Sequence, residues 1–321
     1  MKIRVLKPTE WSAYDDLARI HGTLFNRLDW VQLFGARMKI FGLFDAGESL
    51  IGGLSMYGDR RWGLTFLRRP PFTPTCGPFF ASKAQNPVAI VEERRKVLEA
   101  MAEQVLRDNP AVCMLSLDRR IRDALPFLWR GFKIVPNYTY LLDLSREPDD
   151  LLRRMSPERR KNLTKAAKDG LEVRIEPDLH GVRDLVLGTF RRQGKAVDEP
   201  ALDAVLFHYA RPENSYAFST CREGRTIASV FVVHDESTAY YLMGGYRESG
   251  RHHGAGAAAM WAAIRHAQSL GLTTFDFEGS ILPPIERYFR GFGGDVVPYY
   301  TVNRAWWPVE TALKCIRRSV F

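Results

Sequence analysis

The segment Arg251–Gly256, which reads RHHGAG, has the residue types and spacing best suited to chemistry in this chain. It lies between an aromatic strand-like run, AYYLMGGY, and a helix-like run, AAAMWAAIRHAQSLG. A helix start offers backbone N–H groups without intrahelical partners, and the helix dipole adds partial positive charge there. A plain junction between a loop and a helix is the alternative. We expect this turn to bind the phosphates of a donor through Arg251, His252, His253, Gly254, Ala255 and Gly256.

The two histidines of this turn are adjacent, so their side chains diverge and are poorly placed to share a metal ion. We expect His252 and His253 to be exposed loop residues. No other histidine stands at metal-ligand spacing from a cysteine, so no metal is predicted.

Two glycines end the strand-like run before the turn. Glycine at such a position marks a bulge, the close approach of a ligand or a simple strand-ending turn. A splayed strand would expose the backbone N–H groups of Gly244, Gly245 and Tyr246. Such a group could polarise a thioester or ester carbonyl as negative charge develops on its oxygen.

Two carboxylates follow in the strand-like segment FDFEGS, where alternation places Asp276 and Glu278 on one face. A carboxylate at a strand end beside a bound donor can accept a proton from an amine nucleophile, directly or through water. Glu278 is the preferred base because it is closer to the strand end, and a structural ion pair is the alternative. In the next segment, IERYFRGFGG, Tyr288 could donate a proton to a leaving thiolate and Arg290 could hold a carboxylate or phosphate.

Other polar residues are candidates for binding an acceptor. In the helix expected over 156–169, Arg159 and Arg160 flank the buried side and could face a cleft. In the segment TFRRQGKA, Arg191 and Gln193 precede a glycine and could grip the acceptor. Cations at the end of a helix also suit its dipole, which is the structural alternative.

Length and composition favour an ordinary globular protein. The 321 residues, 45% of them hydrophobic, suit about two domains with a core each. The N-terminus lacks the apolar core of a signal peptide and no apolar run reaches the ~20 residues of a membrane span, so we expect a cytoplasmic protein. Four scattered cysteines predict reduced, buried thiols. The net charge of +9 favours polyanionic partners.

The order of expected elements suggests a duplicated α/β unit. The hairpin-like segments FGLFDAGESLIGGLSMY and AFSTCREGRTIASVFVV have the same layout, and a helix-like segment follows each. We predict domains at 1–145 and 146–305, with a basic amphipathic helix at 306–321. We call the segment Arg251–Gly256 the anion turn. The first copy has prolines where the second has the glycines of this turn, and proline has no N–H. Donor binding is therefore expected in the second domain only.

The C-terminal segment WWPVETALKCIRRSVF places apolar residues on one helical face with Lys314, Arg317 and Arg318 beside it. Such a helix suits contact with the inner membrane surface. Docking of this helix on the protein's own core is the alternative.

Four motifs occur in an order that resembles the FemAB-type branch of the GNAT acyltransferase superfamily. They are RRKNLTKAAKDGLEV, FRRQG, the RxxGxG helix start, and FDFEGS followed by FRGFGG. The resemblance implies an α/β (α+β) fold of two tandem GNAT-like domains, each a mixed, mostly antiparallel sheet flanked by helices. FemAB-like proteins often have lysine at the position of Arg290, which weighs against roles that need an ammonium group.

The resemblance also implies acyl transfer to an amine, and three hypotheses follow. The first is an N-acyltransferase that uses an acyl-CoA such as acetyl-CoA, acts on an amino sugar or amino acid, and serves cell-envelope or exopolysaccharide synthesis. The second is aminoacyl transfer from tRNA to a peptidoglycan precursor. The third is a non-catalytic binding protein with the same fold. DNA is not an expected partner in any of them.

Overall fold

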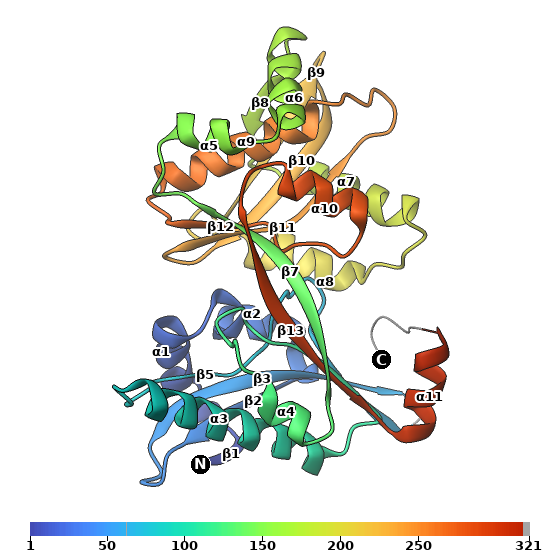
Figure 1. Cartoon of the computed structure of the whole chain (residues 1–321). Coiled ribbons are helices and arrows are strands. Elements are labelled where there is room, and N and C mark those ends of the chain that lie inside the picture. The colour runs from blue at the N-terminus through green and yellow to red at the C-terminus, as the bar shows by residue number, and fades with distance from the viewer. Residues whose placement is uncertain (62, 317–321) are drawn as a thin grey trace. The chain divides into compact units, whose positions relative to one another are not determined.

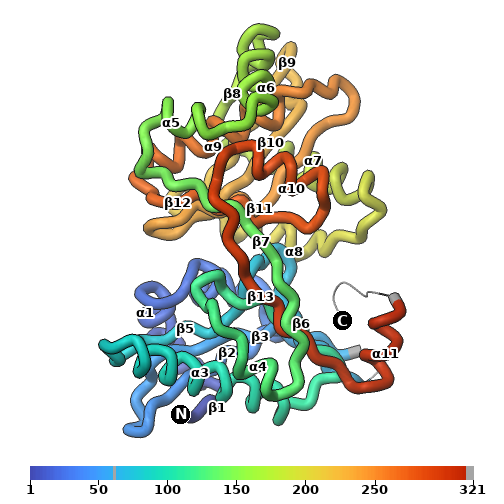
Figure 2. The backbone as a smooth tube through the Cα atoms, viewed as in Figure 1, coloured from blue at the N-terminus to red at the C-terminus, as the bar shows by residue number. Residues whose placement is uncertain are grey.

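The computed structural model of the chain describes residues 1–61 and 63–316. It divides into two compact units, unit 1 of Met1–Asn137 with Pro298–Phe321 and unit 2 of Tyr138–Val297. Figures 1 and 2 show the chain passing between them along two strands, β7 (Lys133–Asp143) and β13 (Asp295–Ala305).

Unit 1 contains a sheet with the strand order β1-β2-β3-β4-β6-β13, in which only β4 and β6 are parallel. The short strand β5 pairs with β3. Three 3-10 turns, η1 (Pro8–Glu10), η2 (Leu24–Asn26) and η3 (Gln32–Arg37), also belong to this unit. Its other elements are β1 (Lys2–Val5), α1 (Trp11–His21), α2 (Leu28–Val31), β2 (Met38–Phe44), β3 (Leu50–Arg61), β4 (Leu64–Arg68), β5 (Phe79–Phe80), α3 (Pro87–Asp108), β6 (Val112–Ser116), α4 (Leu125–Trp129) and α11 (Trp307–Ile316).

Unit 2 contains a sheet with the order β8-β9-β10-β11-β12-β7, in which only β11 and β12 are parallel. Its elements are α5 (Pro148–Arg154), α6 (Pro157–Lys168), β8 (Glu172–Ile175), α7 (His180–Arg192), α8 (Glu199–Asp203), the π-helix η4 (Ala204–Tyr209), β9 (Ser215–Arg222), β10 (Arg225–His234), β11 (Thr238–Tyr246), α9 (Ala255–Ser269), β12 (Thr274–Asp276) and α10 (Pro283–Arg290).

The two sheets share one topology. In each, the fourth and fifth strands are parallel and joined by a long helix, which is α3 in unit 1 and α9 in unit 2. The sixth strand is exchanged, since β13 pairs with β6 and β7 pairs with β12. The unit boundaries therefore fall inside β7 and β13 and differ from the domain limits that we expected at 145 and 305. The segment after 305 belongs to unit 1.

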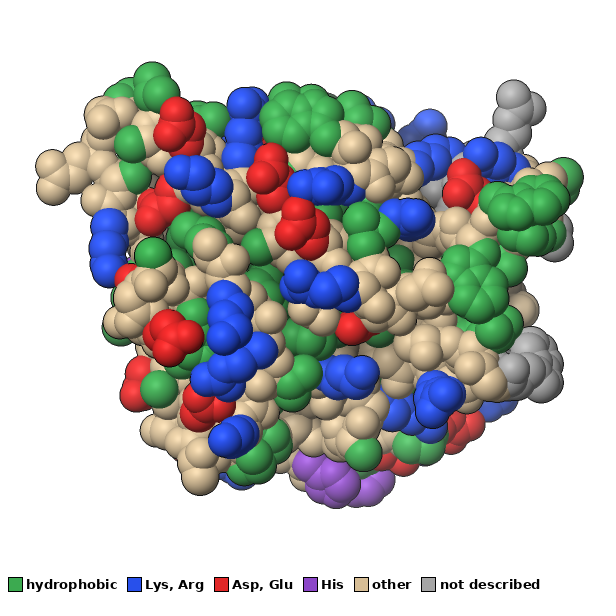
Figure 3. Space-filling view, turned by 90° about the horizontal axis from the view of Figure 1, so that it is seen from below, with side chains coloured by type: hydrophobic (Ala, Val, Ile, Leu, Met, Phe, Trp, Pro, Cys, Tyr) green, Lys and Arg blue, Asp and Glu red, His purple; other side chains and the backbone are tan. Residues whose placement is uncertain are grey.

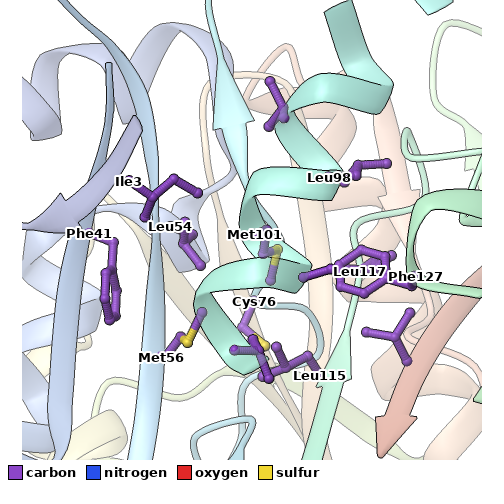
Figure 4. Close-up of a cluster of buried hydrophobic side chains, with 14 of the residues drawn as sticks. Ile3, Phe41, Leu54, Met56, Cys76, Leu98, Met101, Leu115, Leu117 and Phe127 are labelled. Atoms are coloured by element: carbon purple, nitrogen blue, oxygen red, sulfur yellow. The ribbon is translucent and has the colours of Figure 1, made fainter. Parts of the chain in front are cut away.

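The core of unit 1 forms where α3 packs on the sheet (Figure 4). Asn86 caps this helix by accepting the N–H of Ala89 at 2.9 Å, and Pro87 fits the first turn because that position needs no N–H donor. Leu98 and Met101 are buried on the sheet-facing stripe of the helix. The stripe recurs every three to four residues, as expected for an amphipathic helix.

The core of unit 2 fixes the elements around the predicted site. Small residues on α9, including Ala259 and Ala263, are buried and let this helix approach the sheet closely. The ring of Phe277 stacks on Phe292 at a centroid distance of 5.4 Å and lies 5.8 Å from Phe289. These contacts anchor α10 against the segment that follows β12.

Two expectations about composition are tested by the fold. Cys76, Cys113 and Cys221 are buried, but Cys315 is exposed on α11, where neighbouring residues are also exposed, so the prediction of four buried thiols was wrong there. Within the described residues, no helix combines the length and the apolar character that crossing a bilayer requires.

Candidate active site

The predicted anion turn ends in a helix start with free backbone amides. Within the described residues, no side chain caps α9, whose N-cap is Gly254. The first i to i+4 bond of the helix runs from the N–H of Ala258 to the carbonyl of Gly254 at 2.9 Å. The N–H groups of Gly256 and Ala257 precede this bond. Ala257 is fully buried, so the amide of half-buried Gly256 is the one available to an anion.

The glycines of the turn have packing reasons that the sequence did not reveal. A Cβ at Gly254 would lie 2.3 Å from the carbonyl oxygen of Asn162, so glycine here allows α6 to pack against the start of α9. The backbone of Gly254 has φ −89°, which any residue adopts. A Cβ at Gly256 would lie 3.3 Å from the hydroxyl of Tyr288. Room for an anion is therefore not the reason for glycine at position 254.

The side chain of His252 is buried, and the expectation of an exposed loop histidine was wrong for this residue. Its side chain is 6% exposed, and its Nε2 lies 2.9 Å from Oδ2 of Asp169 at the end of α6. Its Nδ1 accepts the N–H of Gly254 at 3.0 Å, so the proton of the neutral ring is on Nε2. Hydrogen bonds from Lys165 and His252 lower the pKa of Asp169 to about 2. His253 is exposed.

Two guanidinium groups meet over Tyr246 at the end of β11. The Arg192 guanidinium carbon lies 4.2 Å from the centroid of the ring, and that of Arg251 lies 5.4 Å from it. No carboxylate of the described residues forms an ion pair with either arginine, and both are exposed. These cations can therefore take part in binding a phosphate. We had predicted donor binding by Arg251 and Tyr246 but not by Arg192, which belongs to the segment TFRRQGKA that we had considered for the acceptor.

The strand β11 separates from β12 before it reaches the anion turn. Their last parallel pair is Tyr240 with Asp276, whereas β11 continues to Tyr246. A Cβ at Gly245 would lie 2.3 Å from the carbonyl oxygen of Leu185 in α7, and one at Gly244 would lie 2.7 Å from that of Ser229. Close packing thus explains both glycines. The role of these amides in polarising a carbonyl stays a prediction.

The two predicted carboxylates occupy different environments. Asp276 is buried, and its Oδ1 accepts the hydroxyl of Thr139 at 2.5 Å and the N–H of Glu278 at 2.9 Å. This pattern holds the loop after β12 in place. Glu278 is half-buried, with φ +59°, a left-handed conformation that costs energy for a residue with a side chain. Glu278 follows the C-terminal end of β12. Because β11 and β12 are parallel, β11 runs toward the same edge of the sheet.

Tyr288 and Arg159 meet near the start of α9. The Arg159 guanidinium carbon lies 4.8 Å from the ring centroid of Tyr288, and burial raises the pKa of that phenol. The Arg159 side chain is 6% exposed, and its Nη2 pairs with Glu158 at 2.8 Å. Its buried Nε has no hydrogen-bond partner among the described residues. The structure therefore brings Arg159, Tyr288 and Gly256 together.

The remaining predicted residues make local contacts or lie at the surface. Arg160 donates to the carbonyls of Arg153 at 3.1 Å and Met155 at 2.6 Å, at the end of α5. Arg290 donates to Glu286 at 2.8 Å. Arg191 and Gln193 are exposed at the end of α7. Acceptor binding by these residues stays a prediction.

The chain is similar to known proteins in one stretch of sequence and in its fold. Residues 153–290 match the family model of the acetyltransferase (GNAT) domain. Comparison with curated protein sequences gave no significant match. Among solved structures, FemX is similar with a TM-score of 0.68 and 12% identity, over 98% of this chain and 100% of FemX.

Two further solved structures share the fold. The C-terminal domain of a putative lysylphosphatidylglycerol synthetase from Agrobacterium fabrum has a TM-score of 0.61 and 11% identity, over 95% of each chain. A tandem GNAT protein from the clavulanic acid biosynthesis pathway has a TM-score of 0.51 and 13% identity, over 83% of this chain and 82% of that one.

These findings assign an acetyltransferase (GNAT) domain to part of the chain. Residues 153–290 form the part that matches the GNAT acetyltransferase domain, and they include the anion turn and both candidate carboxylates. The chain as a whole shares its fold with FemX and with the tandem GNAT protein.

Proposed function

We propose that the chain transfers an acyl group from an acyl-CoA thioester, such as acetyl-CoA, to the amine of a small acceptor. The acceptor class that we propose is an amino sugar or amino acid. One observation carries the proposal, namely the free amide of half-buried Gly256 at the start of α9, inside the region that matches a GNAT acetyltransferase domain.

The residues around this helix start fit a donor that carries a diphosphate. Backbone amides and the helix dipole favour the anion, and Arg192 and Arg251 add two guanidinium groups without carboxylate partners among the described residues. The stretch of β11 from Tyr241 to Tyr246, which has left β12, offers backbone groups to the amides of a coenzyme A arm.

The chemistry that the chain's own residues would supply concerns protons and developing charge. The bound thioester supplies an activated carbonyl, at which a C–N bond forms and the C–S bond breaks. Glu278 would accept the proton of the amine, directly or through water. Backbone N–H groups near Gly244–Tyr246 would stabilise the carbonyl oxygen. Tyr288, which its raised pKa keeps protonated, would donate to the leaving sulfur.

A second candidate is aminoacyl transfer from tRNA to a peptidoglycan precursor. One solved structure that shares the fold is a putative lysylphosphatidylglycerol synthetase, and cations line an open groove along α6 through Arg160, Lys161, Lys165 and Lys168. Lysines and arginines lie among carboxylates on the face shown in Figure 3, which is not the face of the groove along α6.

Ligand-linked stabilisation would separate the two donors. We expect acetyl-CoA to raise the melting temperature of the full chain, and aminoacyl-tRNA to raise it less at physiological salt. A tRNA complex held by phosphate contacts would weaken steeply as salt rises, whereas the complex with the smaller coenzyme would weaken less. Stabilisation by aminoacyl-tRNA alone would favour the second candidate and overturn the first.

We also propose that the protein contacts the inner membrane surface in a role in cell-envelope or exopolysaccharide synthesis. Trp306 and Trp307 are 39% and 80% exposed at the start of α11, and Lys314 is exposed on the same helix. Arg317 and Arg318, which we expected to extend its charge, lie outside the described residues. Trp307→Ala should reduce co-sedimentation with phosphatidylglycerol vesicles, and unchanged co-sedimentation would contradict this contact.

A further inference from the structure

Unit 1 contains a cavity that the proposed reaction does not use. Its volume is about 310 Å³, at the lower end of the range for small-molecule sites. It lies between the first half of α3, the strand β5, the end of α1 and the loop that follows β6. A ligand of this size is an amino acid, a monosaccharide or a single aromatic ring with a short substituent.

The lining of the cavity is mainly apolar. Phe79 and Leu98 are both 3% exposed and belong to the core of the unit, whereas Phe80 and Ile121 are half-buried and Val91 is exposed. Contact with these groups favours a ligand with an aromatic or branched aliphatic body, because covering them removes apolar surface from water.

The charged groups at the rim leave an excess of positive charge. Asp118 accepts the Nε–H of Arg120 at 2.6 Å, and Asp123 accepts that of Arg95 at 2.7 Å. Both carboxylates of the lining are thus neutralised. Arg94 and Arg122 also line the cavity, and neither has an ion pair with any carboxylate of residues 1–61 and 63–316. Two guanidinium groups therefore stand ready for an anion.

In unit 1 an anion would be bound by arginine side chains, because the start of its long helix offers few backbone amides. The helix α3 occupies the place in unit 1 that α9 occupies in unit 2, between the two parallel strands. Pro87 has no N–H, and the side chain of Asn86 already accepts the N–H of Ala89. The start of α3 therefore offers fewer amides to a diphosphate than the start of α9.

We propose that this cavity binds a small organic carboxylate, with its apolar body against Phe79, Leu98 and Ile121 and its carboxylate between Arg94 and Arg122. The site belongs to unit 1 alone and is independent of donor binding at α9. It gives the unit that lacks the anion turn a recognition function of its own.

The test is isothermal titration calorimetry of the full chain with phenylacetate and its neutral counterpart phenylacetamide. We expect phenylacetate to bind about fivefold to tenfold more tightly. Arg94→Gln and Arg122→Gln should each weaken phenylacetate binding about twofold to fivefold and leave phenylacetamide binding unchanged. Arg107→Gln, which changes an exposed arginine of α3 outside the cavity, is the matched control.

A further variant tests whether the ligands bind in this cavity. Ile121→Trp fills the cavity from a half-buried loop position and should weaken both ligands, while unchanged melting of the variant shows that it folds. Equal affinity for the two ligands, wild-type affinity in both arginine variants, or no binding of phenylacetate would each overturn the proposal. None of these results depends on whether acetyl-CoA binds.

Discussion

His252 connects the end of α6 to the start of α9. One ring nitrogen pairs with Asp169 and the other accepts the N–H of Gly254, so the ring fixes the entry to the anion turn. The position of the Gly256 amide therefore depends on the contacts of His252 with Asp169 and Gly254. This contact could not be predicted from the sequence, because the two residues are far apart in the chain.

The pair makes a prediction about pH. The pKa of Asp169 falls from 3.8 to about 2 on folding, so its ionised form stabilises the fold above pH 3.8 and this contribution disappears as pH falls toward 2. Asp169→Asn should therefore melt below the wild type at neutral pH, and the difference should shrink between pH 4 and pH 2.

The control is Asp184→Asn, since Asp184 is exposed on α7 and has no ion pair within the described part of the chain. Its melting temperature should follow that of the wild type at every pH. A difference between Asp169→Asn and the wild type that stays constant down to pH 2 would contradict the assignment.

Glu278 carries the prediction about catalysis. Replacing a general base costs about 10²- to 10⁴-fold in rate, so Glu278→Gln should lower kcat by that range in steady-state assays. Acetyl-CoA affinity should change little, because the carboxylate is assigned to the amine and not to the donor. Glu248→Gln, an exposed residue between β11 and the anion turn, serves as the control. Full activity of the Glu278 variant would remove this residue from the mechanism.

At the scale of elements, the contact between α6 and α9 supports the site. The Cβ of alanine at position 254 would meet the Asn162 carbonyl at 2.3 Å, and that carbonyl belongs to the backbone of α6, so one of the two helices must shift. Gly254→Ala should lower the free energy of unfolding by about 1–3 kcal/mol. Urea denaturation measures this change.

Gly181→Ala is the matched control, because no atom lies within 4 Å of a Cβ at this position in α7. Alanine there should be neutral or stabilise the fold by about 0.5–1 kcal/mol. Equal effects at the two glycines would show that α6 does not pack on the turn as described.

Elements with strong periodicity were predictable from the sequence. The hairpin-like segment FGLFDAGESLIGGLSMY forms the end of β2, the turn and most of β3, and the helix-like segment expected after it is α3. Their patterns of buried residues repeat at the periods of a strand and a helix. The exchange of β7 and β13 between the units could not be predicted, because strand pairing over long distances leaves no local pattern.

The candidate site was predictable only where its residues are neighbours in the sequence. The anion turn is local in sequence, so its residues could be named together. Contacts between distant segments were not predictable, such as the stacking of Arg192 on Tyr246 and the approach of Arg159 to Tyr288. Gly244, Gly245 and Gly254 indicated a close approach in the sequence, but not that the approaching group is protein backbone rather than a ligand.

At the scale of the whole molecule, two units share a topology but differ in the start of the helix between their parallel strands. Gly256 leaves a free amide at α9, whereas Pro87 and the cap from Asn86 occupy the equivalent turn of α3. We therefore expect one donor site per chain. Titration calorimetry with acetyl-CoA should give one molecule bound per chain.

The most direct test of this account compares two substitutions at one position. Gly256→Pro removes the amide that we assign to the diphosphate, and proline is tolerated in a first helical turn. Gly256→Ala adds a similar Cβ near the hydroxyl of Tyr288 but keeps the N–H. We predict that the proline variant binds acetyl-CoA about tenfold or more weakly than the alanine variant, with both folded. Equal affinity of the two variants would contradict donor binding at the start of α9.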